Sequence, residues 1–238
     1  MSAVESDRSA LTDLEKELGL DFNDKSLLER AFIHRSYLNE HPKLGLEHNE
    51  RLEFLGDAVL ELVVTDHLYK NYSNPEGDLT NWRSALVKTE SLSDVAAKLN
   101  LDRFLKLSKG ESKGNARSRA LIHANCVEAT IGAIYLDQGY GEAREFVQNH
   151  IISKLEGILA EGSWVDPKSK FQELAQEREG YTPHYKVLEE MGPDHDKTFT
   201  VGVYVGDRLC GKGQGSSKQA AQQKAAAVAL KAYLKKSA

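Results

Sequence analysis

The chain contains few cysteines and no long hydrophobic segment. Only Cys126 and Cys210 occur in 238 residues, far apart and without metal-ligand spacing, so neither a disulfide framework nor a zinc site is predicted. No apolar run approaches the length of a membrane span. The N-terminal stretch MSAVESDRSALTDLEKEL is charged throughout and lacks the apolar core of a signal peptide. These absences favour a cytoplasmic protein with no membrane partner.

The net charge of −5 is unevenly distributed. Residues 166–238 hold 12 Lys and Arg against 9 Asp and Glu, whereas residues 1–165 hold 19 against 27. The first part therefore has a net charge of −8 and the second part has +3. An acidic part of this kind is suited to divalent cations, and a mildly basic part is suited to phosphates.

Apolar residues recur at helical spacing through the first 160 residues, which predicts an all-α domain. The expected helices are 11–18, 26–33, 50–72, 80–99, 123–136 and 141–159. The basic, glycine-bearing stretch 108–119 is expected to form a loop. The segment GSWVDPK at 162–168 interrupts the helical periodicity with a proline and small residues, so it is the expected linker.

Beyond the linker the sequence pattern changes. A short helix is expected at 170–177 and an alanine-rich helix at 218–234, with alternating strand patterns at 185–191, 198–205 and 208–212. The predicted order α-β-β-β-α describes a small α+β domain that follows the all-α domain.

Three carboxylates gather on one side of the predicted helix 50–72. Glu50, Glu53 and Asp57 fall within roughly 60° of arc at 3.6 residues per turn. Like charges at this spacing repel one another by a few tenths of a kcal/mol per pair. The cluster therefore indicates either a solvated acidic face or a bound cation.

The string around these carboxylates, NERLEFLGDAV at 49–59, resembles the signature of the ribonuclease III family, the double-strand-specific RNA endonucleases. Three further blocks agree in order: AFIHRSY at 31–37, EGDLT at 76–80, and VEA at 127–129 followed by IGAIYLDQG. The C-terminal part, with GPDHDKTF between the first two strands and GQGSSKQAAQQKAA opening the last helix, resembles a double-stranded RNA-binding domain. The resemblance implies an endonuclease domain at 8–160, a linker at 161–167 and an RNA-binding domain at 168–236.

The resemblance also implies the residues of a metal site. Magnesium, for which manganese would substitute, prefers oxygen ligands. The implied metal ligands are Glu53, Asp57, Asn125 and Glu128, of which Asp57 and Glu128 are the implied catalytic pair. Supporting acidic positions at the rim of the same valley are Glu50 and Glu76, whereas Glu61 matches no family site and is expected to be solvated.

Asn125 departs from the resemblance, because the family usually has aspartate three residues before the second glutamate. Its amide oxygen is able to ligate a hard cation, but one negative charge is lost. One interpretation is an active enzyme with weaker metal affinity, and the alternative is a non-catalytic protein that binds double-stranded RNA. A di-metal helical oxidase is disfavoured, because it needs Glu-x-x-His motifs and none of the eight histidines follows a Glu at that spacing.

The RNA-binding residues are likewise implied by the resemblance. Such domains read A-form shape across two minor grooves and the phosphates between them. Gln172 and Glu173 match positions that reach one minor groove, and His195 lies in the loop that reaches the other. Lys218 matches a phosphate-binding lysine at a helix N-terminus. Glutamines stand where lysines are common at 219 and 222, and the lysines expected to compensate are Lys212 and Lys224.

The resembled family acts as homodimers of the endonuclease domain, in which each centre cuts one strand. Phe54 matches the aromatic residue that fills a socket in the partner, although the sequence alone is equally compatible with an ordinary core phenylalanine. The implied products carry 5′-phosphate and 3′-hydroxyl ends with short 3′ overhangs. The implied role is the processing of ribosomal and messenger RNA.

Overall fold

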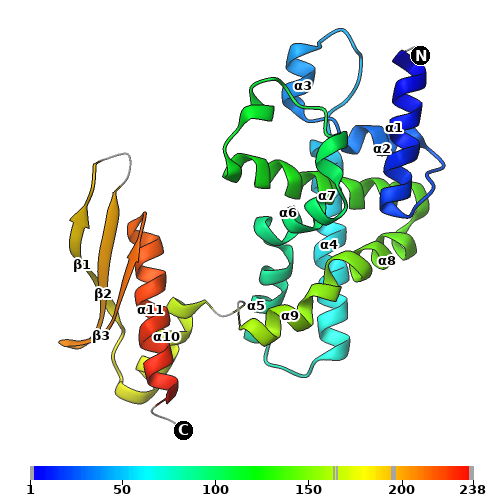
Figure 1. Cartoon of the computed structure of the whole chain (residues 1–238). Coiled ribbons are helices and arrows are strands. Elements are labelled where there is room, and N and C mark those ends of the chain that lie inside the picture. Colours follow the sequence, from blue (N-terminus) through cyan, green and yellow to red (C-terminus); the bar gives the residue numbers. More distant parts are fainter. Residues whose placement is uncertain (1–2, 163, 165, 194–196, 236–238) are drawn as a thin grey trace. The chain divides into compact units, whose positions relative to one another are not determined.

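The structure, a computed structural model, describes residues 3–162, 164, 166–193 and 197–235. The chain forms two compact units, Met1–Trp164 and Val165–Ala238. A helical unit is followed by a unit of three strands and two helices (Figure 1). The predicted fold class is confirmed. The predicted domain limits stay predictions, and residues 163 and 165 of the expected linker lie outside the described residues.

The larger unit consists of helices joined by short connections. The α-helices are α1 (Ala3–Leu18), α2 (Lys25–Ala31), α3 (Arg35–Glu40), α4 (Glu50–Asn71), α5 (Glu76–Val87), α6 (Thr89–Lys98), α7 (Ala116–Gln138), α8 (Tyr140–His150) and α9 (Leu155–Glu161). Three 3₁₀ turns are η1 (Leu101–Phe104), η2 (Glu111–Lys113) and η3 (Ile152–Lys154).

Helix α7 lies at the centre of this unit and packs against α2, α4, α6 and α8 (Figure 1). Nearly every side of α7 is buried between Cys126 and Ile134. The start of α4 is tied to the end of α2, because the buried Asn49 donates from Nδ2 to the carbonyl of Ala31 at 3.2 Å. This bond helps to fix the position of the α4 carboxylates along the axis of α7.

The expected helix 80–99 is instead two helices, α5 and α6, separated by an extended Lys88 with φ −62° and ψ 152°. Leu86 and Leu92 are both fully buried. In one straight helix, two residues six positions apart would point about 120° away from each other. The change of direction lets α5 pack on α4 and α9 while α6 packs on α7, so both leucines reach the core.

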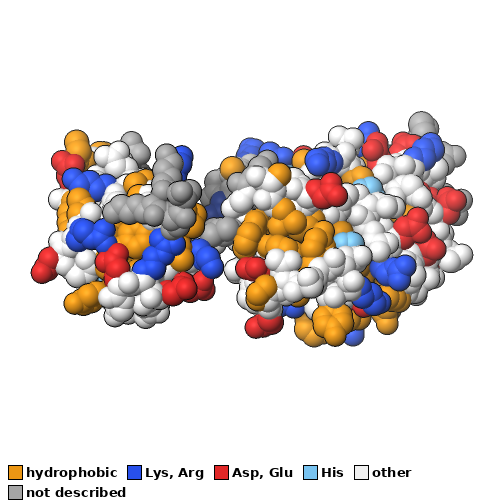
Figure 2. Space-filling model, turned by 90° about the horizontal axis from the view of Figure 1, so that it is seen from below, with side chains coloured by type: hydrophobic (Ala, Val, Ile, Leu, Met, Phe, Trp, Pro, Cys, Tyr) orange, Lys and Arg blue, Asp and Glu red, His pale blue; other side chains and the backbone are white. Residues whose placement is uncertain are grey.

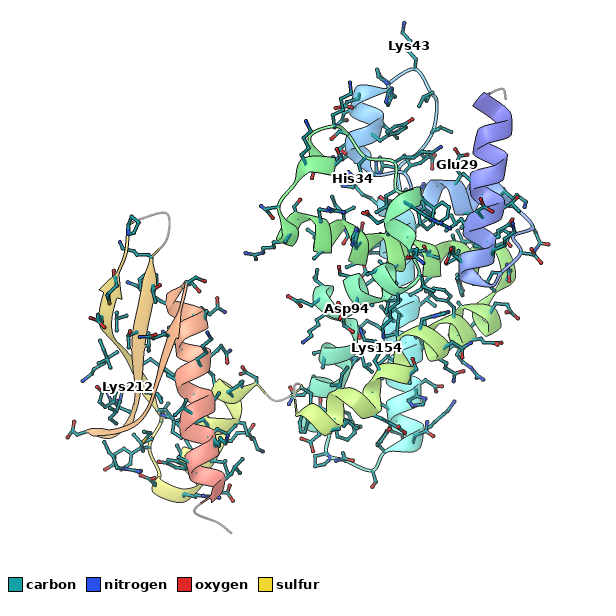
Figure 3. The ribbon with its side chains drawn as sticks, in the orientation of Figure 1. Glu29, His34, Lys43, Asp94, Lys154 and Lys212 are labelled. Carbon is teal, nitrogen blue, oxygen red and sulfur yellow. The ribbon has the colours of Figure 1, made fainter. Side chains whose placement is uncertain are left out.

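Other parts of the larger unit also differ from the sequence-based expectation. Helix α7 starts at Ala116, inside the expected loop, because Oδ1 of Asn115 accepts a capping bond from the backbone of Ser118 at 2.9 Å. The expected helix 141–159 is divided into α8, η3 and α9. Helix α3 was not expected at all. Lys154 of η3 bonds to the Ser91 carbonyl at 2.7 Å and lies near Asp94 of α6 (Figure 3), which fastens the divided segment.

The smaller unit contains α10 (Pro167–Glu179), β1 (His184–Met191), β2 (Thr198–Val205), β3 (Arg208–Gly215) and α11 (Lys218–Lys235). The strands form one antiparallel sheet in the order β1-β2-β3. The two helices and one sheet face bury Phe171, Val203, Ala225 and Tyr233. This is the predicted α-β-β-β-α order.

Glycines on β3 bring α11 close to the sheet. A Cβ atom added to Gly213 would lie 2.2 Å from the backbone nitrogen of Ala225, and one added to Gly211 would lie 2.5 Å from the carbonyl oxygen of Ala225. Side chains at these positions would push the helix away from the strand. The close contact also means that the inward face of β3 is backbone rather than side chain.

The surfaces of both units are mixed in charge. Figure 2 shows one face, on which acidic and basic side chains are interspersed and hydrophobic side chains gather in one area of the larger unit. Within the described part of the chain, every helix is too short or too polar to cross a membrane.

Candidate functional site

The predicted carboxylates lie where α4 and α7 cross. A Cβ atom added to Gly56 would lie 1.7 Å from the carbonyl oxygen of Glu128, and one added to Gly132 would lie 2.2 Å from the carbonyl oxygen of Leu52. The two helices therefore touch backbone to backbone, which only glycine permits at these positions. This contact places Glu128 of α7 beside the acidic side of α4.

The acidic groups at the crossing perturb one another. The pKa of Glu128 is raised to about 8, first by burial and then by the negative charges of Asp57 and Glu53. Burial also raises the pKa of Glu53, and the charge of Glu50 adds to this effect. A hydrogen bond from the Asn125 side chain acts in the opposite direction on Glu53. The four predicted metal-site residues are thus brought together, and Glu128 is largely protonated at neutral pH.

The donor set fits a hard divalent cation. Carboxylate and amide oxygens are the ligands that magnesium and similar ions prefer, and a cation would relieve the repulsion that raises the pKa of Glu128. The side chains interact without converging on one point: among the described residues, no three His, Cys, Asp or Glu groups stand close enough together to hold a metal ion. Glu53, Asp57 and Glu128 would therefore have to move closer together to share an ion.

The supporting acidic residues lie at different places. Glu50 starts α4 and pairs with Arg35 at 3.2 Å. Glu76 starts α5 and lines a hollow with Thr65 of α4. Because Thr65 is eight residues beyond Asp57, the hollow lies about 12 Å further along the helix axis. Within one chain, Glu76 is therefore not part of the carboxylate group.

Glu61 is not simply solvated, so that expectation is wrong. Its carboxylate pairs with Nε of Arg83 at 3.0 Å, and the guanidinium also donates to the Thr65 hydroxyl at 3.0 Å. This pair joins α4 to α5 beside the hollow that Glu76 lines.

Phe54 is 82% exposed, which overturns the interpretation of an ordinary core phenylalanine. It follows Glu53 directly and projects from α4 away from the unit's own core. Leu62 and Tyr69 are also exposed, and the three side chains fall within about 80° of arc around α4. This side of α4 therefore exposes three large apolar side chains, and the exposed Arg51 and Thr65 lie within the same arc.

The smaller unit presents its predicted RNA-binding residues on two helices. Gln172 and Glu173 are exposed on α10, and Lys218 is exposed at the start of α11. Nζ of Lys218 pairs with Glu190 of β1 at 3.1 Å. His195 lies outside the described residues.

The two lysines expected to compensate for the glutamines lie elsewhere. Gly211 and Gly213 face α11, so Lys212 between them points to the opposite face of the sheet (Figure 3). That Lys212 compensates for the missing lysines in phosphate binding stays a prediction, and any contact it makes would be on this opposite face. Lys224 is exposed, but it lies about 120° around α11 from Lys218.

Comparison with known families agrees with this arrangement. The family model "Ribonuclease-III-like" matches residues 24–155, and the model "Double-stranded RNA binding motif" matches residues 167–233. Ribonuclease 3 of Carboxydothermus hydrogenoformans is 48% identical over 225 residues, which cover 94% of this chain and 96% of the relative. The chain belongs to the ribonuclease III family.

Other members of the ribonuclease III family give the same result. Ribonuclease 3 of Latilactobacillus sakei is 45% identical over 226 residues, covering 94% of this chain and 97% of the relative. The solved nuclease domain of ribonuclease III from Campylobacter jejuni is 40% identical, with a TM-score of 0.53, and covers 59% of this chain and 94% of that one. The chain is accordingly an endoribonuclease of double-stranded RNA from a metal-dependent family, and the oxidase reading is excluded.

The two crossing glycines of this ribonuclease III-family chain were not identified from the sequence. Both lie inside the family strings, in LGDAV and TIGAI, where they are single small residues on helices. The available signal was their position: Gly56 lies between Glu53 and Asp57, and Gly132 lies one turn beyond Glu128. Glycine in a helix interior is costly, so its presence beside site residues indicates a close approach.

Proposed function

We propose that the larger unit hydrolyses phosphodiester bonds of double-stranded RNA with magnesium held by Glu53, Asp57, Asn125 and Glu128, and that manganese substitutes. The observation that carries this proposal is the close crossing of α4 and α7 at Gly56 and Gly132, which sets Glu128 beside Asp57 and Glu53. A bound cation would stabilise the charged form of Glu128 and offset its burial and the repulsion from Asp57 and Glu53. The expected products carry 5′-phosphate and 3′-hydroxyl ends with short 3′ overhangs.

The chemistry assigns roles to the chain's own residues. When bound, divalent cations activate water and stabilise charge on the phosphate and the departing oxygen. Asp57 and Glu128, from two different helices, fix the position of the site across the crossing. Asn125 would contribute an oxygen without a charge, and its amide donates to Glu53. We infer that the natural site binds its cation less tightly than one with aspartate at 125.

We also propose that two chains pair through α4. Phe54 is exposed, and a hollow of about 220 Å³ between α4 and α5 is lined by residues that include Tyr69, Glu76 and Leu79. Phe54 and Tyr69 are fifteen residues apart, about 22 Å along one helix, so Phe54 does not reach its own hollow. Insertion into the hollow of a second copy would bring that copy's Glu76 next to Glu53.

A cleavage assay tests the catalytic part. Purified protein is incubated with a long RNA duplex and titrated with magnesium or manganese, and a DNA duplex of the same sequence serves as the control. We expect staggered cuts in the RNA duplex and no cuts in the DNA duplex. Binding of the RNA duplex without cleavage at any concentration of either metal would favour the non-catalytic alternative, for which Asn125 is the specific reason.

Sedimentation tests the pairing. Phe54→Ala is expected to shift the protein from dimer to monomer and to reduce cleavage, while Leu136→Ala, which trims an exposed leucine on α7, is expected to leave both unchanged. A dimeric Phe54→Ala variant with full activity would contradict this part of the proposal.

A further inference from the structure

Lys168 differs from the other lysines near the RNA-binding helices because a neutral amide holds its ammonium group. Nζ of Lys168 donates to Oε1 of Gln222 at 2.8 Å and lies 4.9 Å from the centroid of the Tyr185 ring. Among the described residues, the contacts of the Lys168 ammonium are with this amide and this ring, and no ion pair within 4.0 Å involves it. By contrast, Lys170 pairs with Glu173, and Lys218 pairs with Glu190, each at 3.1 Å.

The position of Lys168 links the two helices that carry the predicted RNA contacts. Lys168 and Gln172 are four residues apart on α10, so they share a face of that helix. Gln222 and Lys218 are likewise four residues apart on α11. Because Lys168 touches Gln222, its ammonium lies where these two faces meet. The nearby start of α11 adds the positive end of a helix dipole.

Asp166, two residues before Lys168, has other hydrogen-bond partners. Asp166 accepts from the backbone of Ser169 at 3.0 Å and from Nε2 of Gln223 at 2.8 Å. Its carboxylate caps α10 and fastens it to α11. Because the partners of Lys168 are a neutral amide and an aromatic ring, its ammonium is able to bind an anion from outside.

The glutamine at 222 is what allows this arrangement. A lysine there would bring a second ammonium near Lys168, and the two like charges would repel each other. Gln222 instead accepts from Lys168 through its oxygen and keeps its amide N–H groups as donors. The two side chains together present one positive charge and additional N–H donors.

We propose that Lys168 is a phosphate-binding residue of the smaller unit, supplying from α10 the positive charge that position 222 of α11 lacks. Its ligand is a backbone phosphate of duplex RNA. The assignment rests on the proposed function of this unit in binding RNA duplexes, and it adds a residue for which no RNA contact was predicted.

The test measures binding by the full chain in EDTA, which prevents cleavage, with a labelled RNA duplex longer than the ~16 base pairs that such modules span. Anisotropy titrations over a series of salt concentrations give both the Kd and the salt slope. For Lys168→Gln we expect roughly fivefold weaker binding and a slope reduced by about one unit, the signature of one lost phosphate contact. Lys231→Gln, an exposed lysine near the other end of α11, is the matched control and is expected to remain within about twofold of wild type.

The exchanged variant Lys168→Gln/Gln222→Lys separates charge from packing. It keeps one amide and one ammonium in contact and moves the charge to α11, so the Kd and the slope are expected to return to within about twofold of wild type. Thermal unfolding of each variant reports on folding. If Lys168→Gln is poorly folded, the exchanged variant alone decides.

Three results would overturn the assignment: Lys168→Gln that binds like wild type, weaker binding with an unchanged salt slope, or a folded exchanged variant that fails to recover. Failure of the wild-type protein to bind duplex RNA is a different outcome, because it would remove the proposed function itself.

Discussion

Replacing Glu128 by glutamine should make the metal-free protein more stable at alkaline pH. The pKa of Glu128 is raised from an ordinary 4.5 to about 8 by burial and by Asp57 and Glu53. Above that pH the folded state must hold three charged carboxylates close together. In the unfolded chain the same three groups are charged but are not held close together. Glu128→Gln removes one of these charges and nearly preserves the shape of the side chain.

The sign and the size of the effect on the free energy of unfolding follow from this pKa shift. Between pH 4.5 and about 8 the folded protein holds the Glu128 proton more tightly than the unfolded chain does, so the free energy of unfolding decreases as pH rises through this window. Each pKa unit corresponds to about 1.4 kcal/mol, which sets an upper bound of roughly 5 kcal/mol. Because the side chain is only partly buried and water screens its charge, we expect an effect of about 2 kcal/mol.

Tryptophan fluorescence is a suitable assay, because both tryptophans lie in the larger unit, with the rings of Trp82 and Trp164 in edge-to-face contact at 5.7 Å. Urea unfolding in EDTA would be followed at about pH 5 and about pH 9. Wild-type protein should lose stability at the higher pH, and Glu128→Gln should lose less. Glu145→Gln, an exposed acid on α8, is the control and should follow wild type.

Added magnesium should make wild type the more stable of the two proteins. A cation that binds the folded state stabilises it, and Glu128→Gln lacks one ligand charge. The same variant should lose cleavage while retaining duplex binding, which is assigned mainly to the smaller unit. The reasoning is refuted if wild type and Glu128→Gln show the same pH dependence without metal. Equal loss of binding and cleavage in a folded variant would mean that Glu128 is not a metal ligand.

Three further predictions concern single residues. Gly56→Ala should lower the free energy of unfolding by about 3 kcal/mol, because its methyl group would overlap the neighbouring helix; a urea midpoint like that of wild type would contradict the observed crossing. Asn125→Asp should lower the magnesium concentration needed for half-maximal cleavage, with manganese improving the natural protein more than the variant; an unchanged requirement would place residue 125 outside the site. Glu190→Gln should free Lys218 and tighten duplex binding by about two- to threefold with a steeper salt slope; an unchanged Kd would show that the ion pair does not compete with RNA.

Helical periodicity was sufficient to predict which α4 carboxylates share a side, because Glu53 and Asp57 lie on one helix and their relation is local. The approach of Glu128 is not local. It depends on two glycines that lie far apart in sequence and on different helices, and neither one alone shows where the other lies. The family resemblance supplied this grouping, and the helix crossing gives its physical basis.

Two features of the fold were beyond any local pattern. The break at Lys88 contains neither glycine nor proline, and it arises because α5 and α6 bury leucines on different neighbours. The sequence left Phe54 open between a core residue and a partner contact, and only the packing of the described helices shows that it is exposed.

The backbone-to-helix contact between β3 and α11 restricts how this domain is able to evolve. Ala221, Ala225 and Ala229 are completely buried where the glycines of β3 approach. Substitution by larger residues is therefore blocked both on α11 and on β3. Val228, on the outward side of the same helix, is half exposed and free to vary. Natural variation in this helix should therefore be one-sided, and its rotation about its own axis, which aims Lys218, is preserved along with the glycines.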